Sequence, residues 1–156
     1  MAASRDDIVR AIREAQKQIE GVASSLPEAA WSKGVYEQGW NAKQLLSHLA
    51  AGASLASVQI AIAKARLPGP RSSFDQDAFN AVEVAARQEM PVAELLNELR
   101  NNFAQSIVAV EAAPDEILAQ PSQLPDGPNG PLGDVILEAV REHTAMHLRD
   151  LHSAMG

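Results

Sequence analysis

Three of the four histidines in the chain, His48, His143 and His147, fall on the apolar stripes of two expected helices. His143 and His147 are four residues apart, a spacing that places both side chains on one helix face with Cβ atoms about 5–6 Å apart. Imidazole binds zinc at about 2.0–2.1 Å, and three protein ligands plus water form an open, catalytic type of site. Three buried rings without a shared proton or metal would be costly. The pattern therefore predicts a metal site formed by these three residues.

The three histidines also have plainer interpretations. A histidine pair at this spacing occurs on helix surfaces, and a single histidine on an apolar stripe is more often a hydrogen-bonded core residue. A zinc-peptidase motif requires glutamate directly after the first histidine, and Thr144 occupies that position, so this enzyme class is disfavoured. No general base stands out, which leaves a metal-bound water or thiolate as the reactive group. His152 lies off this helix face and is expected in solvent.

The helix that must position His48 has a well-marked start. Its first residues have the spacing of a capping box and a hydrophobic staple, formed by Trp40, Asn41, Gln44 and Leu45. We expect a single helix from Asn41 to about Arg66, with His48 on its inward stripe.

Two aromatic residues could border a pocket at the entrance of this helix. Trp40 already has a sufficient structural role in the staple, and pockets are commonly lined by aromatic side chains. Tyr36 is the only tyrosine, and its phenol could donate a proton or contact a substrate. The plainer interpretation of Tyr36 is a loop residue without such a role. Trp40 and Tyr36 are the candidate substrate-pocket residues.

Three further helices are expected around the one that carries His48. The first spans about 4–25, the third runs from Pro91 to about Ala113, and the fourth begins near Gly133 and runs almost to the C-terminus. The first has a bundle-type apolar seam, made of Ile8, Ile12, Ala15, Ile19, Val22 and Leu26. The fourth carries its two histidines on a stripe with Ile136, Val140 and Leu151.

Two long connections join these helices. Residues 67–90 include a stretch of helical composition from Phe74 to Gln88, which Asp75, Asp77 or Asn80 could cap. Residues 114–133 are rich in proline and glycine. Such a long connection is often functional or mobile, but a plain surface crossover is the more common case. We expect an all-α, four-helix bundle in one domain, residues 1–156.

Composition excludes several classes of function. Of the 156 residues, 46% are hydrophobic, only 4% are aromatic, and 28 are alanine, which favours close-packed helices over a sheet. The net charge of −7 comes without a basic stripe, so no nucleic-acid partner is expected. The absence of cysteine excludes disulfides and a protein thiolate. Any thiol in the chemistry must arrive with a substrate.

One segment is apolar enough to suggest a membrane helix. Residues 44–63 contain no Asp, Glu, Lys or Arg, and their length is roughly that of a membrane span. They also contain His48 and several serines and glutamines, which favours the most buried helix of a soluble bundle. The N-terminus has no apolar region of a signal peptide. We therefore expect a cytoplasmic protein that does not insert into a membrane.

Two segments resemble a known family. Gly39-Trp-Asn-Ala-Lys-Gln-Leu-Leu-Ser-His-Leu-Ala-Ala-Gly resembles the signature that opens the second helix of the DinB-like superfamily, which includes the N-terminal domain of mycothiol-dependent maleylpyruvate isomerase. Arg141-Glu-His-Thr-Ala-Met-His-Leu-Arg-Asp-Leu resembles the histidine-bearing helix that closes that fold. Both motifs are short, and their order and separation make the resemblance specific over nearly the whole chain.

The resemblance implies a fold and a cofactor. Members are four-helix bundles in an up-down-down-up order, with a long crossover between the second and third helices. One histidine of the second helix and two of the fourth bind a divalent ion, often zinc or nickel, which corresponds here to His48, His143 and His147. Relatives include transferases and isomerases that use mycothiol or bacillithiol as a thiol cosubstrate, and many are homodimers.

These observations lead to two hypotheses of different classes, beside the plainer one in which the histidines only satisfy each other or the backbone. The first is an enzyme that uses a metal and a low-molecular-weight thiol for S-transfer to, or detoxification of, a small electrophile, with hydrolysis as a variant. The second is a stress-associated protein that binds a metal or ligand without turnover.

Overall fold

Most of the described chain is helical, in agreement with the expected all-α class. The computed structural model describes residues 3–36, 39–67, 75–124 and 127–156. The elements in chain order are α1 (Arg5–Ser25), the 3-10 helix η1 (Glu28–Ser32), α2 (Ala42–Gly52), α3 (Leu55–Ala65), α4 (Gln76–Ala85), α5 (Val92–Ala112), α6 (Asp115–Leu118), β1 (Pro121–Gln123), β2 (Asn129–Pro131), α7 (Leu132–His152) and the 3-10 helix η2 (Ser153–Met155).

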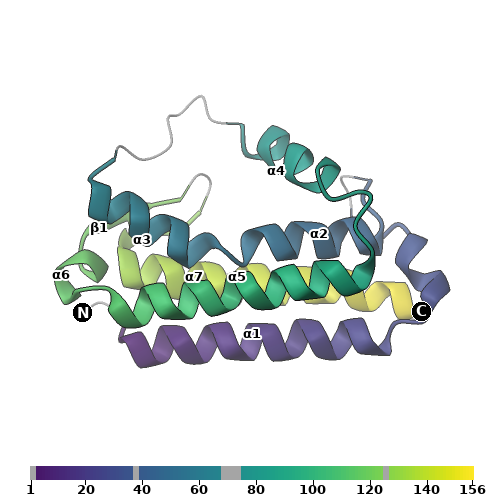
Figure 1. Ribbon diagram of the computed structural model, residues 1–156, viewed down its shortest axis with the longest axis horizontal. Helices are drawn as coiled ribbons and strands as arrows, with labels where there is room; N and C mark the ends of the chain where they lie inside the picture. The colour runs from purple at the N-terminus through teal and green to yellow at the C-terminus, as the bar shows by residue number, and fades with distance from the viewer. Residues whose placement is uncertain (1–2, 37–38, 68–74, 125–126) are drawn as a thin grey trace.

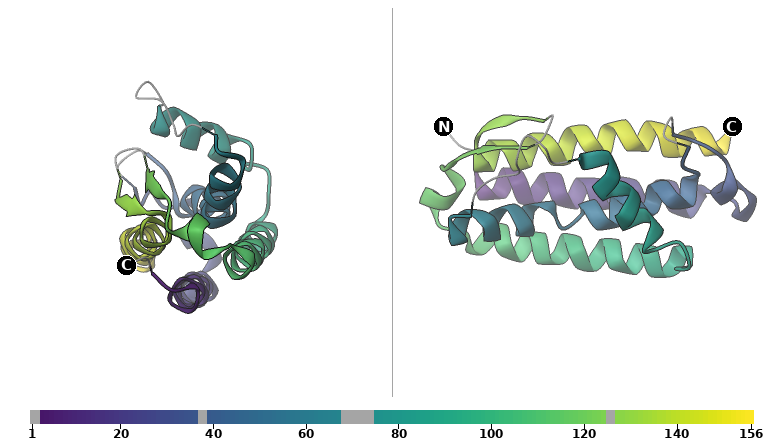
Figure 2. Two further views of the ribbon diagram at one scale, coloured as in Figure 1. Left: turned by 90° about the vertical axis from the view of Figure 1, so that its left-hand side faces the viewer. Right: turned by 90° about the horizontal axis from the view of Figure 1, so that it is seen from above.

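The long helical segments lie side by side (Figure 1). α1 and α7 run in one direction, and α2–α3 and α5 run in the opposite direction. The end-on view in Figure 2 shows these segments around a common centre, with α4 outside them. α4 packs mainly on α2.

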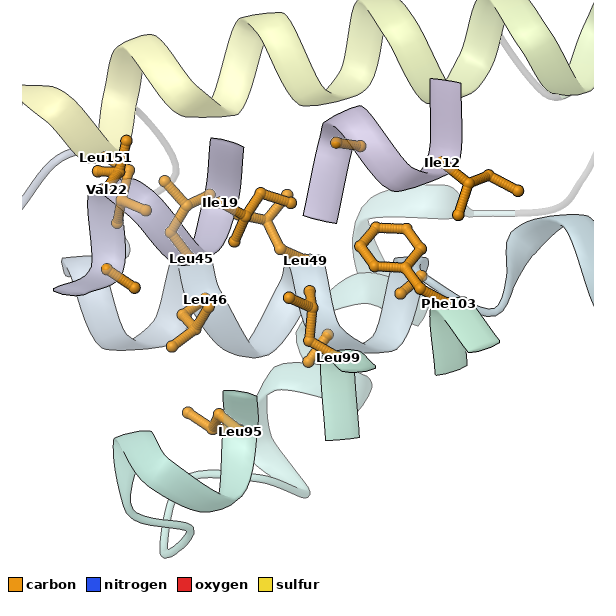
Figure 3. Packing of buried hydrophobic residues seen from close by; sticks show 14 of the residues in the cluster. Ile12, Ile19, Val22, Leu45, Leu46, Leu49, Leu95, Leu99, Phe103 and Leu151 are labelled. Atoms are coloured by element: carbon orange, nitrogen blue, oxygen red, sulfur yellow. The ribbon is translucent and has the colours of Figure 1, made fainter. Parts of the chain in front are cut away.

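The core forms where the apolar stripes of α1, α2, α5 and α7 meet, and Figure 3 shows part of this packing. Every residue of the seam predicted for α1 is buried. α1 begins as expected, because the Ser4 hydroxyl accepts a hydrogen bond from the Asp7 amide at 3.1 Å. Leu45, Leu46 and Leu151 are fully buried and bring α2 against its neighbours.

The second helical segment is broken, so the expected single helix from Asn41 to Arg66 is wrong. α2 ends at Gly52 and α3 begins at Leu55. α3 does end where expected, with Arg66 in the left-handed conformation at φ 54°.

Side chains of α5 explain this break. The buried Ser106 hydroxyl donates to the Ala53 carbonyl at 2.8 Å and accepts from the Ser57 amide at 3.4 Å. In a continuous helix the Ser57 amide would donate to the Ala53 carbonyl. The Ser106 hydroxyl takes the place of this hydrogen bond by bonding both groups. Asn102 Nδ2 also donates to the Ala50 carbonyl at 2.8 Å. Insertion of a side chain into the ladder is a recognised cause of helix kinks.

The two long connections carry more structure than a plain crossover. α4 lies within the stretch predicted from Phe74 to Gln88, and its N-cap is Asp75, which accepts from the Ala78 amide at 2.9 Å. Phe74 itself lies outside the described residues. The connection 114–133, expected as a surface crossover, contains α6 and an antiparallel hairpin of β1 and β2.

The segment Ala42–Ala65 passes a membrane-span test by length and composition, with a mean hydropathy of 1.5. In the structure this segment is α2 and α3, and half of its most apolar window is buried within the protein. α2 is packed on α5 and α7, whereas only Ala56 and Ile60 of α3 are buried, so the segment is less enclosed than expected for the most buried helix of the bundle.

Candidate metal centre

α2 positions His48 through its N-terminus. The Asn41 side chain accepts from the Gln44 amide at 2.8 Å, and the Gln44 side chain accepts from the Asn41 amide at 2.9 Å. This is the predicted capping box. His48 follows one turn later on the face that also buries Leu45, and its side chain is almost completely buried.

α7 positions His143 and His147 on one face, as the four-residue spacing predicts. Ile136 and Leu151, on the same stripe, are fully buried and anchor the helix on both sides of the pair. His147 is only 2% exposed, whereas His143 is partly buried. His152 is exposed, as expected.

The three imidazoles meet in space, although His48 lies 95 residues before His143 and 99 residues before His147 in the sequence. Nε2 of His48 lies 2.9 Å from Nε2 of His143. The ring centroids are 4.9 Å apart for His48 and His143, 4.9 Å for His48 and His147, and 4.4 Å for His143 and His147. One nitrogen from each ring lies within 4.8 Å of the other two. We call these three residues the histidine cluster.

Burial keeps the cluster uncharged at neutral pH. Desolvation, and to a smaller extent the neighbouring His143, lower the pKa of His48 to about 4. Desolvation alone lowers the pKa of His143 to about 4. The pKa of His147 falls to about 3, first through desolvation and then through the two other rings. Neutral imidazole is the form that binds a metal ion.

One nitrogen of the cluster lacks a formed hydrogen bond. Nδ1 of His147 is buried, and among the described residues it is the one buried side-chain nitrogen or oxygen atom without a hydrogen-bond partner. An Asp150 carboxylate oxygen lies 3.4 Å from it. The two atoms are close, but the contact does not have hydrogen-bond geometry, and the neutral ring forms no ion pair with the carboxylate.

Both candidate pocket residues lie against the cluster. The Tyr36 ring is 5.3 Å from the His147 ring, and the Trp40 ring is 5.2 Å from the His48 ring. The two aromatic rings are 5.4 Å apart. Trp40 is buried and Tyr36 is partly buried. The aromatic pair therefore packs against two of the three imidazoles, those of His48 and His147.

Two surface grooves lie elsewhere on the bundle. One of about 900 Å³ lies between α1 and α5 and is lined by Arg13, Lys17 and Arg100, among others. The other, of about 380 Å³, lies between α1 and α7 and includes Thr144. The histidine cluster lines neither groove.

The donor set fits a divalent ion. Two nitrogens bound at about 2.0–2.1 Å to one ion are at most about 4.2 Å apart, and His48 and His143 meet this limit. Three neutral imidazoles without a carboxylate ligand suit zinc or nickel better than magnesium or calcium. The buried, unsatisfied Nδ1 of His147 is an uncommon feature of a native protein, and an ion bound at the ring is one explanation for such an atom.

Sequence reasoning missed two residues near the cluster. Asp150 follows His147 by three residues, a spacing that places both on one helix face and that could have identified it. Gly52 borders His143, because a Cβ atom at that position would lie 3.6 Å from Cε1 of the histidine ring. No local signal in the sequence indicates this second contact, since it joins two helices.

These features define the chain as a helical-bundle protein with a buried histidine cluster supplied by two of its helices. The chain belongs to the family described as the mycothiol maleylpyruvate isomerase N-terminal domain, whose model matches residues 12–152. The family resemblance inferred from the two motifs is therefore confirmed.

Two solved structures share the fold. One is the crystal structure of the mycothiol-dependent maleylpyruvate isomerase, with a TM-score of 0.67 and 16% sequence identity over 98% of this chain. The other is a histidine-to-alanine variant of that enzyme, with a TM-score of 0.67 and 15% identity over 98% of this chain. The chain spans 60% of the length of each. No curated protein matches the chain.

Proposed function

We propose that His48, His143 and His147 hold one divalent ion, zinc or nickel, and that the protein uses it with a low-molecular-weight thiol to act on a small electrophile. The observation that carries this proposal is the convergence of three neutral imidazoles from two helices, two of them buried and one partly buried. A divalent ion at this position would supply Lewis acidity and lower the pKa of a thiol. The mycothiol dependence named for the solved relative supports a thiol cosubstrate.

The residues around the ion have separable roles in this proposal. The three rings present nitrogen lone pairs at neutral pH because burial disfavours their protonation. Trp40 and Tyr36 exclude water from one side and form an aromatic wall for the substrate. The capping box fixes the start of α2 and hence the depth of His48.

Several broader features belong to the same proposal. The directions of the helices in Figure 1 support an up-down-down-up four-helix bundle that forms one domain over residues 1–156. We further propose a homodimer that acts in the cytoplasm on small molecules, without a nucleic-acid or membrane partner.

A stress-associated binding protein without turnover is the second candidate. The observation that favours it is the coverage of the cluster, because His147 is 2% exposed and two aromatic rings lie against the imidazoles. A ligand reaches His147 only if the surrounding side chains move. In this candidate the same residues bind the ion, but no thiol is transferred.

Elemental analysis of untagged protein, purified without a nickel column, tests the metal. We expect close to one zinc or nickel per chain, and His147→Ala should lose the metal while circular dichroism retains most of the helix signal. An unchanged stoichiometric metal content in His147→Ala would contradict the assignment.

Metal-loaded protein is then assayed with mycothiol, bacillithiol and glutathione against a panel of electrophiles. Turnover that depends on metal and thiol supports the enzyme, and its absence across the panel supports the binding protein.

A further inference from the structure

The tautomer of His147 decides which of its nitrogens can bind a metal ion. A neutral imidazole has one N–H and one lone pair, and the hydrogen bond made by one nitrogen determines the state of the other. If Nε2 of His147 points to the shared ion, the proton resides on Nδ1, which then needs an acceptor. In metal sites, that acceptor is commonly a carboxylate or a backbone carbonyl.

Asp150 is suitably placed to be this acceptor. Its Oδ2 atom lies 3.4 Å from Nδ1 of His147, and the two residues are three positions apart on α7. The Asp150 side chain is 29% exposed, whereas that of His147 is 2% exposed. Asp150 is therefore the more accessible of the two side chains, and its carboxylate lies beside the ring nitrogen that needs an acceptor.

The rest of the cluster offers no equivalent acceptor for His147. His48 and His143 approach each other through their Nε2 atoms at 2.9 Å, so these atoms face the proposed ion. The acidic residues Glu138 and Glu142 on α7 are exposed, away from the buried stripe. Asp150 is the carboxylate that the structure brings within ion-pair distance of a cluster histidine among the described residues.

We propose that Asp150 is a positioning residue whose carboxylate accepts a hydrogen bond from Nδ1–H of His147 and thereby directs Nε2 of this ring to His48 and His143. This inference rests on the proposed metal site and extends it, because it assigns a role to a residue outside the three ligands. Asp150 acts through the histidine ring and does not contact the ion.

The test compares zinc affinity and the ring tautomer in matched variants. Metal-free wild type, Asp150→Ala, Asp150→Asn and Asp150→Glu are titrated with zinc against a chromophoric chelator. Glu138→Gln is the control, because it removes one negative charge from the same helix at an exposed position. The tautomer of His147 is read from its ring ¹⁵N chemical shifts in the zinc-loaded proteins.

We expect Asp150→Ala to bind zinc about 10–100-fold more weakly than wild type, as is typical when a partner behind a ligand is removed. Asp150→Asn should lose less, since its side-chain oxygen still accepts a hydrogen bond from Nδ1–H, and Asp150→Glu should recover part of the loss because it keeps a carboxylate. The Nδ1-protonated form of His147 should dominate in wild type and become mixed with the other tautomer in Asp150→Ala. Glu138→Gln should match wild type.

Two outcomes separate the failure of this inference from that of the proposed function. If wild type binds zinc through the cluster, and Asp150→Ala and Asp150→Asn match it in affinity and tautomer, the role of Asp150 is wrong and the metal site stands. If wild type does not bind zinc or nickel, both proposals are wrong. Circular dichroism and thermal unfolding of the metal-free variants identify any loss of affinity that comes from unfolding, and the Asn variant then decides the question.

Discussion

The two halves of the second helical segment, α2 and α3, are alike in composition and different in structure. Residues 44–63, which span both, contain no charged side chain. α2 begins with a complete capping box, whereas α3 has no side-chain hydrogen bond at its N-cap. Seven residues of α2 are buried, and in α3 only Ala56 and Ile60 are. The difference shows that apolar composition alone does not determine which half becomes core.

Contacts with other helices account for this difference. α2 lies between α5 and α7, and α4 packs over it, so few of its faces remain exposed. α3 is packed mainly on α5, and Val58 remains 47% exposed. The one histidine of this segment lies on the well-enclosed half. A ligand on the enclosed half has few alternative positions, which favours a precise site.

The largest difference between the halves should appear when a polar residue of each is removed. His48→Ala on α2 should lose stoichiometric zinc, with an affinity more than about 100-fold below wild type, because losing a ligand costs more than losing its outer partner. Gln59→Ala on α3 should keep the affinity of wild type. Chelator competition with metal-free protein measures both. Equal losses in the two variants would mean that metal retention reflects general stability of the segment.

The second-largest difference between α2 and α3 should be the loss of stability when one apolar side chain of each is truncated. Leu46 is fully buried, so Leu46→Ala should lower the free energy of unfolding by about 2–5 kcal/mol. Val58 is 47% exposed, and Val58→Ala should change it by less than about 0.5 kcal/mol. Urea unfolding of the metal-free proteins gives both values. A loss at Val58 as large as that at Leu46 would indicate that α3 is covered in solution, as in the proposed homodimer.

Local patterns in the sequence account for the parts of the fold that were predicted correctly. The seam of α1, the cap of α2 and the stripe of α7 all depend on residues within a few positions of one another. The same periodicity placed the three histidines on inward faces. Their convergence on one point needed the family resemblance, because no local pattern states how two helices are oriented.

The features that were not predicted depend on contacts between distant residues. Ser106 breaks the ladder between Ala53 and Ser57 from a helix about 50 residues away, and an exposed or buried serine looks the same in the sequence. The contact of Tyr36 with His147 likewise joins a loop to the last helix. The hairpin of β1 and β2 lies in a proline-rich segment that resembles an irregular connection.

The junction between the halves gives a smaller effect. Ser106→Ala removes the hydroxyl that bonds the Ala53 carbonyl and the Ser57 amide, and should lower the free energy of unfolding by about 1–3 kcal/mol. Val108→Ala, at a position of α5 that is 67% exposed, is the control and should have little effect. Urea unfolding measures the change. If Ser106→Ala were as stable as wild type, the Ala53 carbonyl and the Ser57 amide would have formed a hydrogen bond with each other. The break between α2 and α3 would then depend on the serine alone.

The smallest effect concerns how the two halves begin. Asn41→Ala removes one side of the capping box of α2 and should cost about 1 kcal/mol of unfolding free energy. Ser54→Ala at the N-cap of α3 should change the unfolding free energy by less than about 0.5 kcal/mol, because the Ser54 hydroxyl does not cap that helix.

Asn41→Asp is the matched rescue, since aspartate caps as well as asparagine. Urea unfolding of the three variants measures these changes, and hydrogen exchange of the Gln44 amide reports on the cap directly. Faster exchange in Asn41→Ala alone would locate the difference at the start of α2, whereas equal costs at Asn41 and Ser54 would mean that the capping box does not distinguish the halves.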